Sequence, residues 1–283
     1  MKTIRIIPRL DIKGPNLVKG IHLEGLRVLG KPEDFAHYYY ENGADELFFQ
    51  DTVASLYDRN SLHDIITKTA KEIFIPLTVG GGLRSIDDIR NVLRAGADKV
   101  AINTAAIKNP HFIREASLKF GSSTIVVAIE AIKSNDGRYL AFTDNGREYS
   151  GLEVVAWARK AEELGAGEIV ITSVDKEGTG EGYDIELIKS VSEAVSIPVI
   201  AHGGASSPEN VVRAIQIGKA DAVAIASILH YSVMNTFISL SSDYKLEGNI
   251  SFLNSGKTPK NITTSSLKEI RAALIESQIP TRF

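Results

Sequence analysis

Residues 43–51 read GADELFFQD, and residues 165–173, 122 positions later, read GAGEIVITS. The segment 76–82 (PLTVGGG) has its counterpart at the same offset in 198–204 (PVIAHGG). Two doublings of about this length nearly exhaust the 283-residue chain. The repeat therefore predicts one closed body that is built from two similar halves.

Short apolar runs alternate with amphipathic segments of helical period, which is typical of repeated βα units. Several of these runs are apolar throughout, as in parallel strands that are covered on both faces. The eight expected strands are Ile4–Leu10, Glu46–Gln50, Ile75–Val79, Lys99–Ile102, Thr124–Ile129, Glu168–Thr172, Pro198–Ala201 and Ala222–Ala226. With the repeat they predict an α/β fold, a single (βα)8 TIM barrel made of two (βα)4 half-barrels. An open doubly wound sheet gives no reason for a repeat at half the chain length.

Three connections are long for such a barrel. Residues 13–31 follow the first strand and hold Lys19-Gly20 and Gly25, so they could form a mobile lid. Residues 132–151 contain two glycine turns around a short run, which indicates a β-hairpin. Residues 238–266 are polar and precede the last expected helix, 267–277. We expect residues 1–283 to be one barrel domain that carries this polar insertion.

The composition is that of an ordinary globular protein, with 43% hydrophobic and 24% charged residues. The net charge of −3 and the pI near 6.1 argue against nucleic acid or an anionic membrane as a partner. Cysteine is absent, which excludes disulfides, thiolate catalysis and sulfur-ligated metals. No signal peptide or membrane-spanning run is visible, so we expect a cytoplasmic enzyme.

Glycines end two strands at positions related by the repeat. Backbone N–H groups at such glycines approach an anion closely, and the helix that follows adds the positive end of its dipole. What we term the first cradle consists of Gly81, Gly82, Asn103 and Thr104. The second cradle consists of Gly178, Gly203, Gly204, Ala226 and Ser227. Although any one glycine is more simply explained by a tight turn, the paired clusters predict a substrate with a phosphate at each end.

Two acids occupy matching strand ends in the two halves. Asp11 ends the first strand and Glu130 the fifth, and in a closed barrel they face each other across the mouth. Such a pair can act as acid and base if the environment separates the two pKa values. Asp51 is a weaker third candidate, because its counterpart in the repeat is Ser173.

Other polar residues admit a simpler reading. His202 could be a base or a phosphate donor, whereas we expect His230 at the surface. The six histidines show no metal-ligand spacing, so we predict no metal site and no cofactor. The remaining charges start four strands at the barrel bottom, where they normally serve stability; these are Arg5, Glu46, Lys99 and Glu168.

The quoted segments together resemble one family. The stretches IIPRLDIKGPNLVKG, IPLTVGGGLRSIDDIRNVLRAGADKVAINTAA, VVAIEA and ELGAGEIVITSVDKEGTGEGYD resemble the cyclase subunit of imidazole glycerol phosphate synthase (HisF). The likeness covers essentially residues 1–235 and resumes at about 267–282. The NTAA and GTGEGYD stretches and the TDNGR hairpin separate the chain from the related isomerase.

The resemblance implies a lyase that uses ammonia from a glutaminase (HisH-type) partner docked at the barrel bottom, in a heterodimer. The acceptor would be a bisphosphorylated ribonucleotide of histidine biosynthesis. Asp11 and Glu130 then match the acid–base pair, and Lys19 matches a lid residue. The phosphate positions of the family match Gly82, Asn103, Thr104, Gly178, Gly204, Ala226 and Ser227. The four bottom charges match an ammonia gate.

Several positions depart from the family. Aspartate is usual where this chain has Glu130 and Glu177, cysteine at Arg9, serine at His202 and leucine at Gln50. A longer carboxylate moves the reactive oxygen by ~1.5 Å, and misplacement of about 1 Å can cost ~10²-fold in rate. The four residues of the ammonia gate are retained, whereas the mouth of the barrel is altered. This combination allows a second hypothesis, a paralogue that amidinates an acetamido sugar for surface polysaccharides. A third is a non-catalytic activator of a glutaminase.

Overall fold

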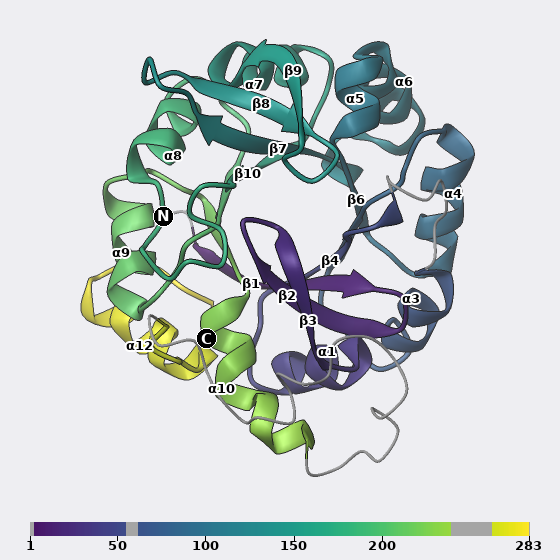
Figure 1. The fold of residues 1–283 in the computed structure, drawn as a ribbon. Helices are drawn as coiled ribbons and strands as arrows, with labels where there is room; N and C mark the ends of the chain where they lie inside the picture. The colour runs from purple at the N-terminus through teal and green to yellow at the C-terminus, as the bar shows by residue number, and fades with distance from the viewer. Residues whose placement is uncertain (1–2, 55–61, 239–261, 283) are drawn as a thin grey trace.

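The computed structural model describes residues 3–54, 62–238 and 262–282. Eight parallel strands close into a barrel with helices around it, seen from the mouth in Figure 1. In order around the barrel the strands are β1 (Arg5–Lys13), β4 (Leu47–Asp51), β5 (Leu77–Gly80), β6 (Lys99–Ile102), β7 (Ile125–Lys133), β10 (Glu168–Ser173), β11 (Val199–His202) and β12 (Ala222–Ile225). Pairing of β12 with β1 closes the ring. The predicted TIM barrel is confirmed.

Helices cover the outside of the barrel. Those of the outer ring are α1 (Pro32–Glu41), α3 (His63–Thr69), α4 (Ile86–Ala95), α6 (His111–Phe120), α7 (Val154–Glu163), α8 (Ile185–Ser192), α9 (Pro208–Gln216) and α12 (Leu267–Glu276). Two further helices, α5 (Thr104–Lys108) and α10 (Ser227–Ile238), begin just after β6 and β12. A 3₁₀ turn, η1 (Ser122–Thr124), precedes β7. Ser85 caps the start of α4 and forms a capping box with Asp88.

The two halves of the barrel carry the same additions. Strands β1 and β7 are each nine residues long, and each continues into an antiparallel hairpin at the mouth. The hairpin after β7 is β8 (Tyr139–Thr143) with β9 (Glu148–Glu153), as predicted from its glycine turns. The hairpin after β1, here called the lid hairpin, is β2 (Asn16–Ile21) with β3 (Glu24–Gly30). Sequence reasoning missed these two strands, because buried Lys19 interrupts their apolar pattern.

Alternation along β1 explains how the barrel is filled. Ile6, Leu10 and Ile12 join the apolar layer between strands and helices. Ile7 belongs to a second cluster inside the barrel, with Phe48, Ala101, Val126, Val170, Ile200, Ala222 and Ala224. Arg5, Arg9 and Asp11 share the parity of Ile7 and therefore lie below and above that inner cluster. One strand thus supplies both a charge at the barrel bottom and polar residues at the mouth.

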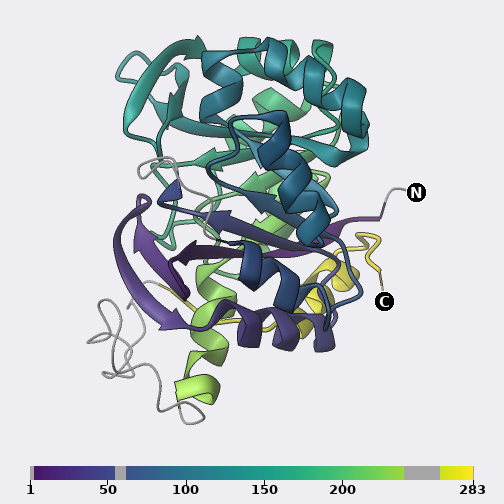
Figure 2. The same cartoon turned by 90° about the vertical axis from the view of Figure 1, so that its right-hand side faces the viewer.

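The chain ends lie away from the mouth. Figure 2 shows both termini on the side opposite the lid hairpin, where Ile4 forms a bridge with Thr281. Helix α10 ends at Ile238, and the polar insertion expected over 238–266 falls almost wholly outside the described residues. Among the described residues, no helix is both long and apolar enough to cross a bilayer.

The surface position expected for His230 is wrong, because the residue is fully buried. It lies in the first turn of α10, which packs against β3. Its Nε2–H donates to the Arg9 carbonyl oxygen at 2.8 Å, and the Tyr39 hydroxyl lies 2.7 Å from its Nδ1. Burial lowers the pKa of His230 to about 4. The side chain therefore holds the backbone of β1 at Arg9 as a neutral hydrogen-bonding group.

Candidate active site at the barrel mouth

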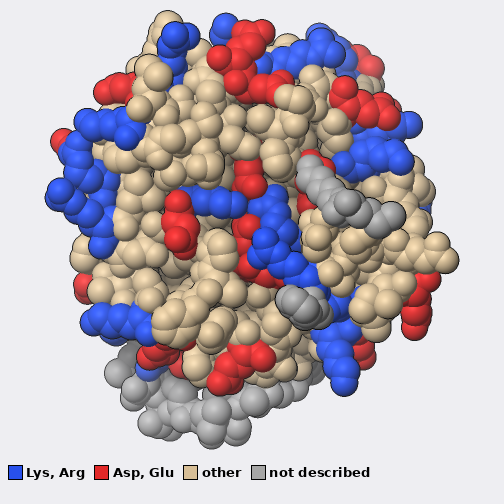
Figure 3. Space-filling view, turned by 180° about the vertical axis from the view of Figure 1, so that it is seen from behind, with Lys and Arg blue, Asp and Glu red and all other residues tan. Residues whose placement is uncertain are grey.

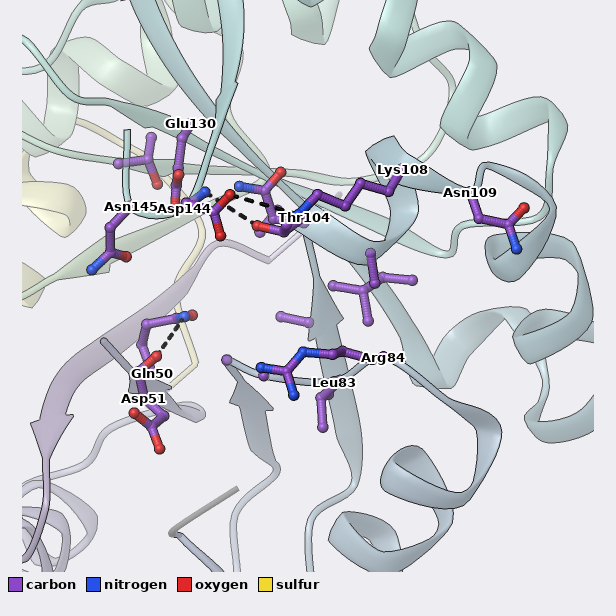
Figure 4. A pocket seen from close by; sticks show the side chains of 18 of the residues that line it. Gln50, Asp51, Leu83, Arg84, Thr104, Lys108, Asn109, Glu130, Asp144 and Asn145 are labelled. Atoms are coloured by element: carbon purple, nitrogen blue, oxygen red, sulfur yellow. Dashed lines mark hydrogen bonds and ion pairs between the residues drawn. The ribbon is translucent and has the colours of Figure 1, made fainter. Parts of the chain in front are cut away.

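A cavity of about 380 Å³ opens at the mouth over β4 to β7 (Figure 4). Residues of the first cradle and the predicted acid Glu130 line it together. Lys108 and Arg84 also line it, and sequence reasoning missed both. The sequence could have indicated both, because Arg84 and Lys108 are positively charged and each follows a cradle residue by only a few positions.

The first cradle has the local geometry of an anion site. Gly81 has a φ of +102°, and a Cβ there would collide with the Asp51 carbonyl oxygen, so only glycine fits. The Thr104 hydroxyl accepts a hydrogen bond from the Asp144 N–H at 3.2 Å, which leaves its own hydrogen for a ligand. The Asn103 Oδ1 atom is buried with no partner among the described residues. The Thr104 hydroxyl and the glycine turn at Gly81 and Gly82 thus border one cavity.

Glu130 lies in the wall of this cavity, near the end of β7. Its carboxylate accepts the Gly146 N–H at 2.8 Å. That bond links Glu130 to the turn of the β8–β9 hairpin, where Asp144 and Asn145 also have positive φ. Burial raises the pKa of Glu130 to about 7, despite the Gly146 hydrogen bond and the charge of Arg9. The side chain can therefore hold a proton near neutral pH.

Asp11 has the opposite electrostatic environment. Its carboxylate accepts a hydrogen bond from Arg9 Nε at 3.0 Å and lies 3.7 Å from Lys19 Nζ. Burial acts to raise the pKa of Asp11, but the two cations outweigh it and the pKa is lowered. Asp11 itself does not line the larger cavity. Arg9 lies between the two acids, since it contacts Asp11 and lines the cavity beside Glu130.

The second cradle is smaller than the first. All five of its residues line a cavity of only about 10 Å³, together with Glu177 and His202. The lid hairpin closes it from above: Lys19 is paired with Glu177, and the His22 N–H donates to the Glu177 carbonyl oxygen at 2.9 Å. A Cβ at Gly178 would collide with the Gly20 carbonyl oxygen. The structure therefore brings the predicted residues together but leaves no room there for a phosphate while the hairpin is down.

Asp51 lines the larger cavity but is occupied by its own turn. Its Oδ1 accepts the N–H groups of Val53 at 3.0 Å and Ala54 at 2.9 Å. It therefore shapes the loop after β4. Gln50, the neighbouring departure, also lines the cavity and donates to the Asp51 carbonyl oxygen at 3.4 Å (Figure 4).

At the barrel bottom four charged side chains form a closed ring, here called the charge ring. Arg5 Nη1 lies 2.7 Å from Glu46 and 2.9 Å from Glu168. Lys99 Nζ lies 3.2 Å from Glu46 and 3.1 Å from Glu168. Figure 3, which views the molecule from behind, shows basic and acidic side chains gathered in the middle of this face. The inner apolar cluster lies directly above the ring.

Known proteins similar to this chain have one description in common. Residues 5–235 match the family described as "Histidine biosynthesis protein". The imidazole glycerol phosphate synthase subunit HisF of Legionella pneumophila is 60% identical over 204 residues, covering 72% of this chain and 96% of that protein. The subunit HisF of Methanocaldococcus jannaschii is 50% identical over 250 residues, and that of Alkaliphilus metalliredigens 47% over 232 residues. Each of the latter two matches covers 82% of this chain and 92% of the relative.

Proposed function

This chain belongs to the histidine biosynthesis family, as a HisF-type cyclase subunit of imidazole glycerol phosphate synthase, and we propose that it joins ammonia to a bisphosphorylated ribonucleotide. The ammonia comes from a separate glutaminase subunit. None of the three relatives is named for a sugar acceptor or a non-catalytic role, so neither alternative hypothesis gains support from them. We expect the complex in the cytoplasm.

One observation supports the mechanism above all others: the acids at matching ends of β1 and β7 have pKa values displaced in opposite directions. Asp11 is held ionised by Arg9 and Lys19, whereas burial favours protonated Glu130, with a pKa of about 7. Pairs of carboxyl groups separated in this way divide into base and acid. We assign Asp11 as the base and Glu130 as the acid.

The proton movements follow from this assignment. Ring formation requires the ammonia nitrogen to add to a carbonyl-type carbon of the acceptor. Glu130 then gives its proton to the oxygen that develops negative charge, and Asp11 takes a proton from the newly bonded nitrogen. The first cradle, with Lys108 nearby, holds one phosphate; the second cradle receives the other once the lid hairpin lifts.

The barrel bottom is the proposed docking face of the glutaminase. The charge ring marks the entry of ammonia into the barrel. The side chains of Arg5 and Lys99 are 12% and 16% exposed, so the ring can be reached from the bottom face. In the connection from α3 to β5, Phe74 is 80% exposed and lines a surface groove with Ile73, Pro76 and Asp98. Exposed aromatic side chains of this kind dominate many protein interfaces.

Replacement of Phe74 tests the docking face. Phe74→Ser should weaken glutaminase binding by about 30-fold or more, if Phe74 is a hot spot worth ~2 kcal/mol. Turnover driven by ammonium salts should stay unchanged, because the mouth is untouched. Tyr149→Ser is the matched control, since Tyr149 is 56% exposed on the β8–β9 hairpin. Equal affinity of both variants for the glutaminase would place the interface elsewhere.

Growth of a histidine auxotroph that lacks this subunit tests the function itself. We expect the chain to restore growth without histidine and Asp11→Asn to abolish it. Asp11→Asn should still bind the glutaminase, which separates lost chemistry from lost assembly. Failure of the unmodified chain to restore growth, although it is produced and binds the glutaminase, would contradict the histidine-pathway assignment.

A further inference from the structure

The mouth contains a buried cation, Arg9, that itself neither gives nor takes a proton in the transfers proposed above. The Arg9 guanidinium lies 5.5 Å from the centre of the Phe48 ring, on top of the inner apolar cluster. Its Nε donates to Asp11. Its Nη1 lies 3.2 Å from Nδ1 of His202 and 3.4 Å from the Thr172 hydroxyl oxygen. Arg9 therefore connects the acid of β1 with a histidine on β11.

The chemistry of arginine decides which ring nitrogen of His202 carries the proton. A guanidinium has only N–H donors and no acceptor. Nδ1 of His202 must therefore accept from Arg9, so it carries no proton. Thr172 Oγ1 lies 3.2 Å from the same nitrogen, and because it already accepts from Arg9, its hydrogen is free to donate to Nδ1 too. A neutral imidazole that accepts at Nδ1 has its proton on Nε2.

Burial, together with the nearby cations, keeps this ring neutral. Burial lowers the pKa of His202 well below its ordinary value, and the nearby cations Arg9 and Lys19 lower it further. His230, also close, acts in the same direction. Asp11 is paired with Arg9 and Lys19. His202 is thus a neutral Nε2–H donor.

The remaining donor of the ring is offered to the second cradle. His202 lines the small cavity beside Gly203, Gly204 and Ser227. Within the described part of the chain, both hydrogen bonds of the ring involve Nδ1, and Nε2 is not among the buried atoms that lack a partner there. Nε2 is therefore accessible, and the cavity is where a ligand would meet it.

We propose that Arg9 fixes His202 as the Nε2-protonated tautomer, so that His202 donates a hydrogen bond to the phosphate held in the second cradle. Arg9 is the positioning residue and His202 the binding residue. The phosphate contact rests on the proposed function; the role of Arg9 does not. The lid hairpin must lift before the contact forms, because the cavity holds only about 10 Å³.

The tautomer is measured without substrate, by nitrogen NMR of protein labelled in its histidines. The His202 signals are assigned by their loss in His202→Gln. In the unmodified chain at neutral pH we expect a protonated Nε2 and an unprotonated Nδ1. In Arg9→Met the Nδ1 signal should move toward the protonated value, because a donor and a positive charge are lost. A proton on Nδ1 in the unmodified chain would overturn the role of Arg9.

The phosphate contact is tested by two replacements of different reach. Glutamine places an amide donor near the position of Nε2, whereas asparagine is too short. His202→Asn should raise KM for the bisphosphorylated ribonucleotide by about 10- to 100-fold, as for a lost hydrogen bond to a charged group, with kcat little changed. His202→Gln should stay within a few-fold of the unmodified chain. Equal KM values for His202→Asn and the unmodified chain would overturn the contact.

A third measurement separates this proposal from the proposed function. If the unmodified chain does not turn over the ribonucleotide, inorganic phosphate is titrated into the labelled protein. We expect a saturable shift of the His202 Nε2 signal, together with the Gly204 amide. A shift at Gly204 without one at His202 would contradict the contact, as would no shift at either.

Discussion

At the scale of single residues, the altered acid is the clearest departure. Glu130 extends further than an aspartate would, and the β8–β9 hairpin meets it with the Gly146 N–H. Sequence reasoning located Glu130 from the symmetry with Asp11. It could not foresee the displaced pKa, because the cause is burial beneath a hairpin turn 16 residues away.

Glu130→Gln should make the protein more stable at alkaline pH. The pKa of Glu130 in the folded protein is raised from 4.5 to about 7. The contribution of Glu130 to the free energy of unfolding is therefore fully present below about pH 4.5 and is lost as the pH rises through about 7. The full loss is about 3 kcal/mol. Glutamine stays neutral, so thermal unfolding at pH 8 should occur roughly 5–10 °C higher than in the unmodified chain.

At pH 5 the difference between the same two proteins should shrink to about a quarter of its value at pH 8, because Glu130 is then almost fully protonated in the folded protein. Glu148→Gln, which removes an exposed carboxyl on β9, is the control and should change neither value. A stability difference between Glu130→Gln and the unmodified chain that does not grow from pH 5 to pH 8 would show that Glu130 has no raised pKa.

At the scale of elements, the lid hairpin distinguishes the two cradles. The buried Lys19–Glu177 pair and the His22 backbone bond hold it over the second cradle, while the first cradle stays accessible. The sequence repeat did not reveal this difference in accessibility between the two cradles, because equivalent glycines predicted equivalent pockets. The difference arises because the lid hairpin is bonded to Glu177 beside the second cradle, whereas the turn of the β8–β9 hairpin lines the first cavity and leaves it open.

Lys19→Met should loosen the lid hairpin. Lys19 is paired with both Glu177 and Asp11. Its replacement leaves these two buried carboxylates without that positive charge, and loss of one partner of a buried ion pair is strongly destabilising. Amide hydrogen exchange within residues 16–30 should become about 10-fold faster or more, while exchange in β7 changes little. Lys176→Met is the control, because its pair with Glu181 is exposed at the surface and such pairs contribute little. Equal exchange in both variants would show that Lys19 does not hold the hairpin.

At the scale of the whole molecule, the charge ring lies at the barrel bottom, the inner apolar cluster lies above it, and the two acids of the proposed mechanism lie at the mouth. Each member of the charge ring bonds two neighbours, so loss of one opens two of the four links. Lys99→Met should therefore raise the number of glutamines consumed per product formed, since ammonia escapes before it reaches the mouth. Turnover with external ammonium should be unchanged. An unchanged glutamine-to-product ratio would contradict a sealing role.

Much of this arrangement was predictable, and the failures have identifiable causes. Apolar strand cores and turn glycines are local signals, so all eight barrel strands and the β8–β9 hairpin were found. His230 was misplaced because its polar partner is the backbone of Arg9, 221 residues away. The importance of Arg9 was hidden for the same reason, since Thr172 and His202 are 163 and 193 residues distant. The arrangement of side chains at the mouth depends on contacts between residues that are far apart in the sequence, and a local sequence pattern does not encode such contacts.

The division of the two acids into base and acid is tested most directly by the pH dependence of turnover. The purified chain is assayed with the bisphosphorylated ribonucleotide at a fixed concentration of neutral ammonia, so that only the protein and substrate titrate. We expect kcat/KM to fall as the pH rises through about 7, where Glu130 loses its proton, and the fall to disappear in Glu130→Gln, which is slow throughout. A rate independent of pH between 6 and 9 in the unmodified chain would contradict it.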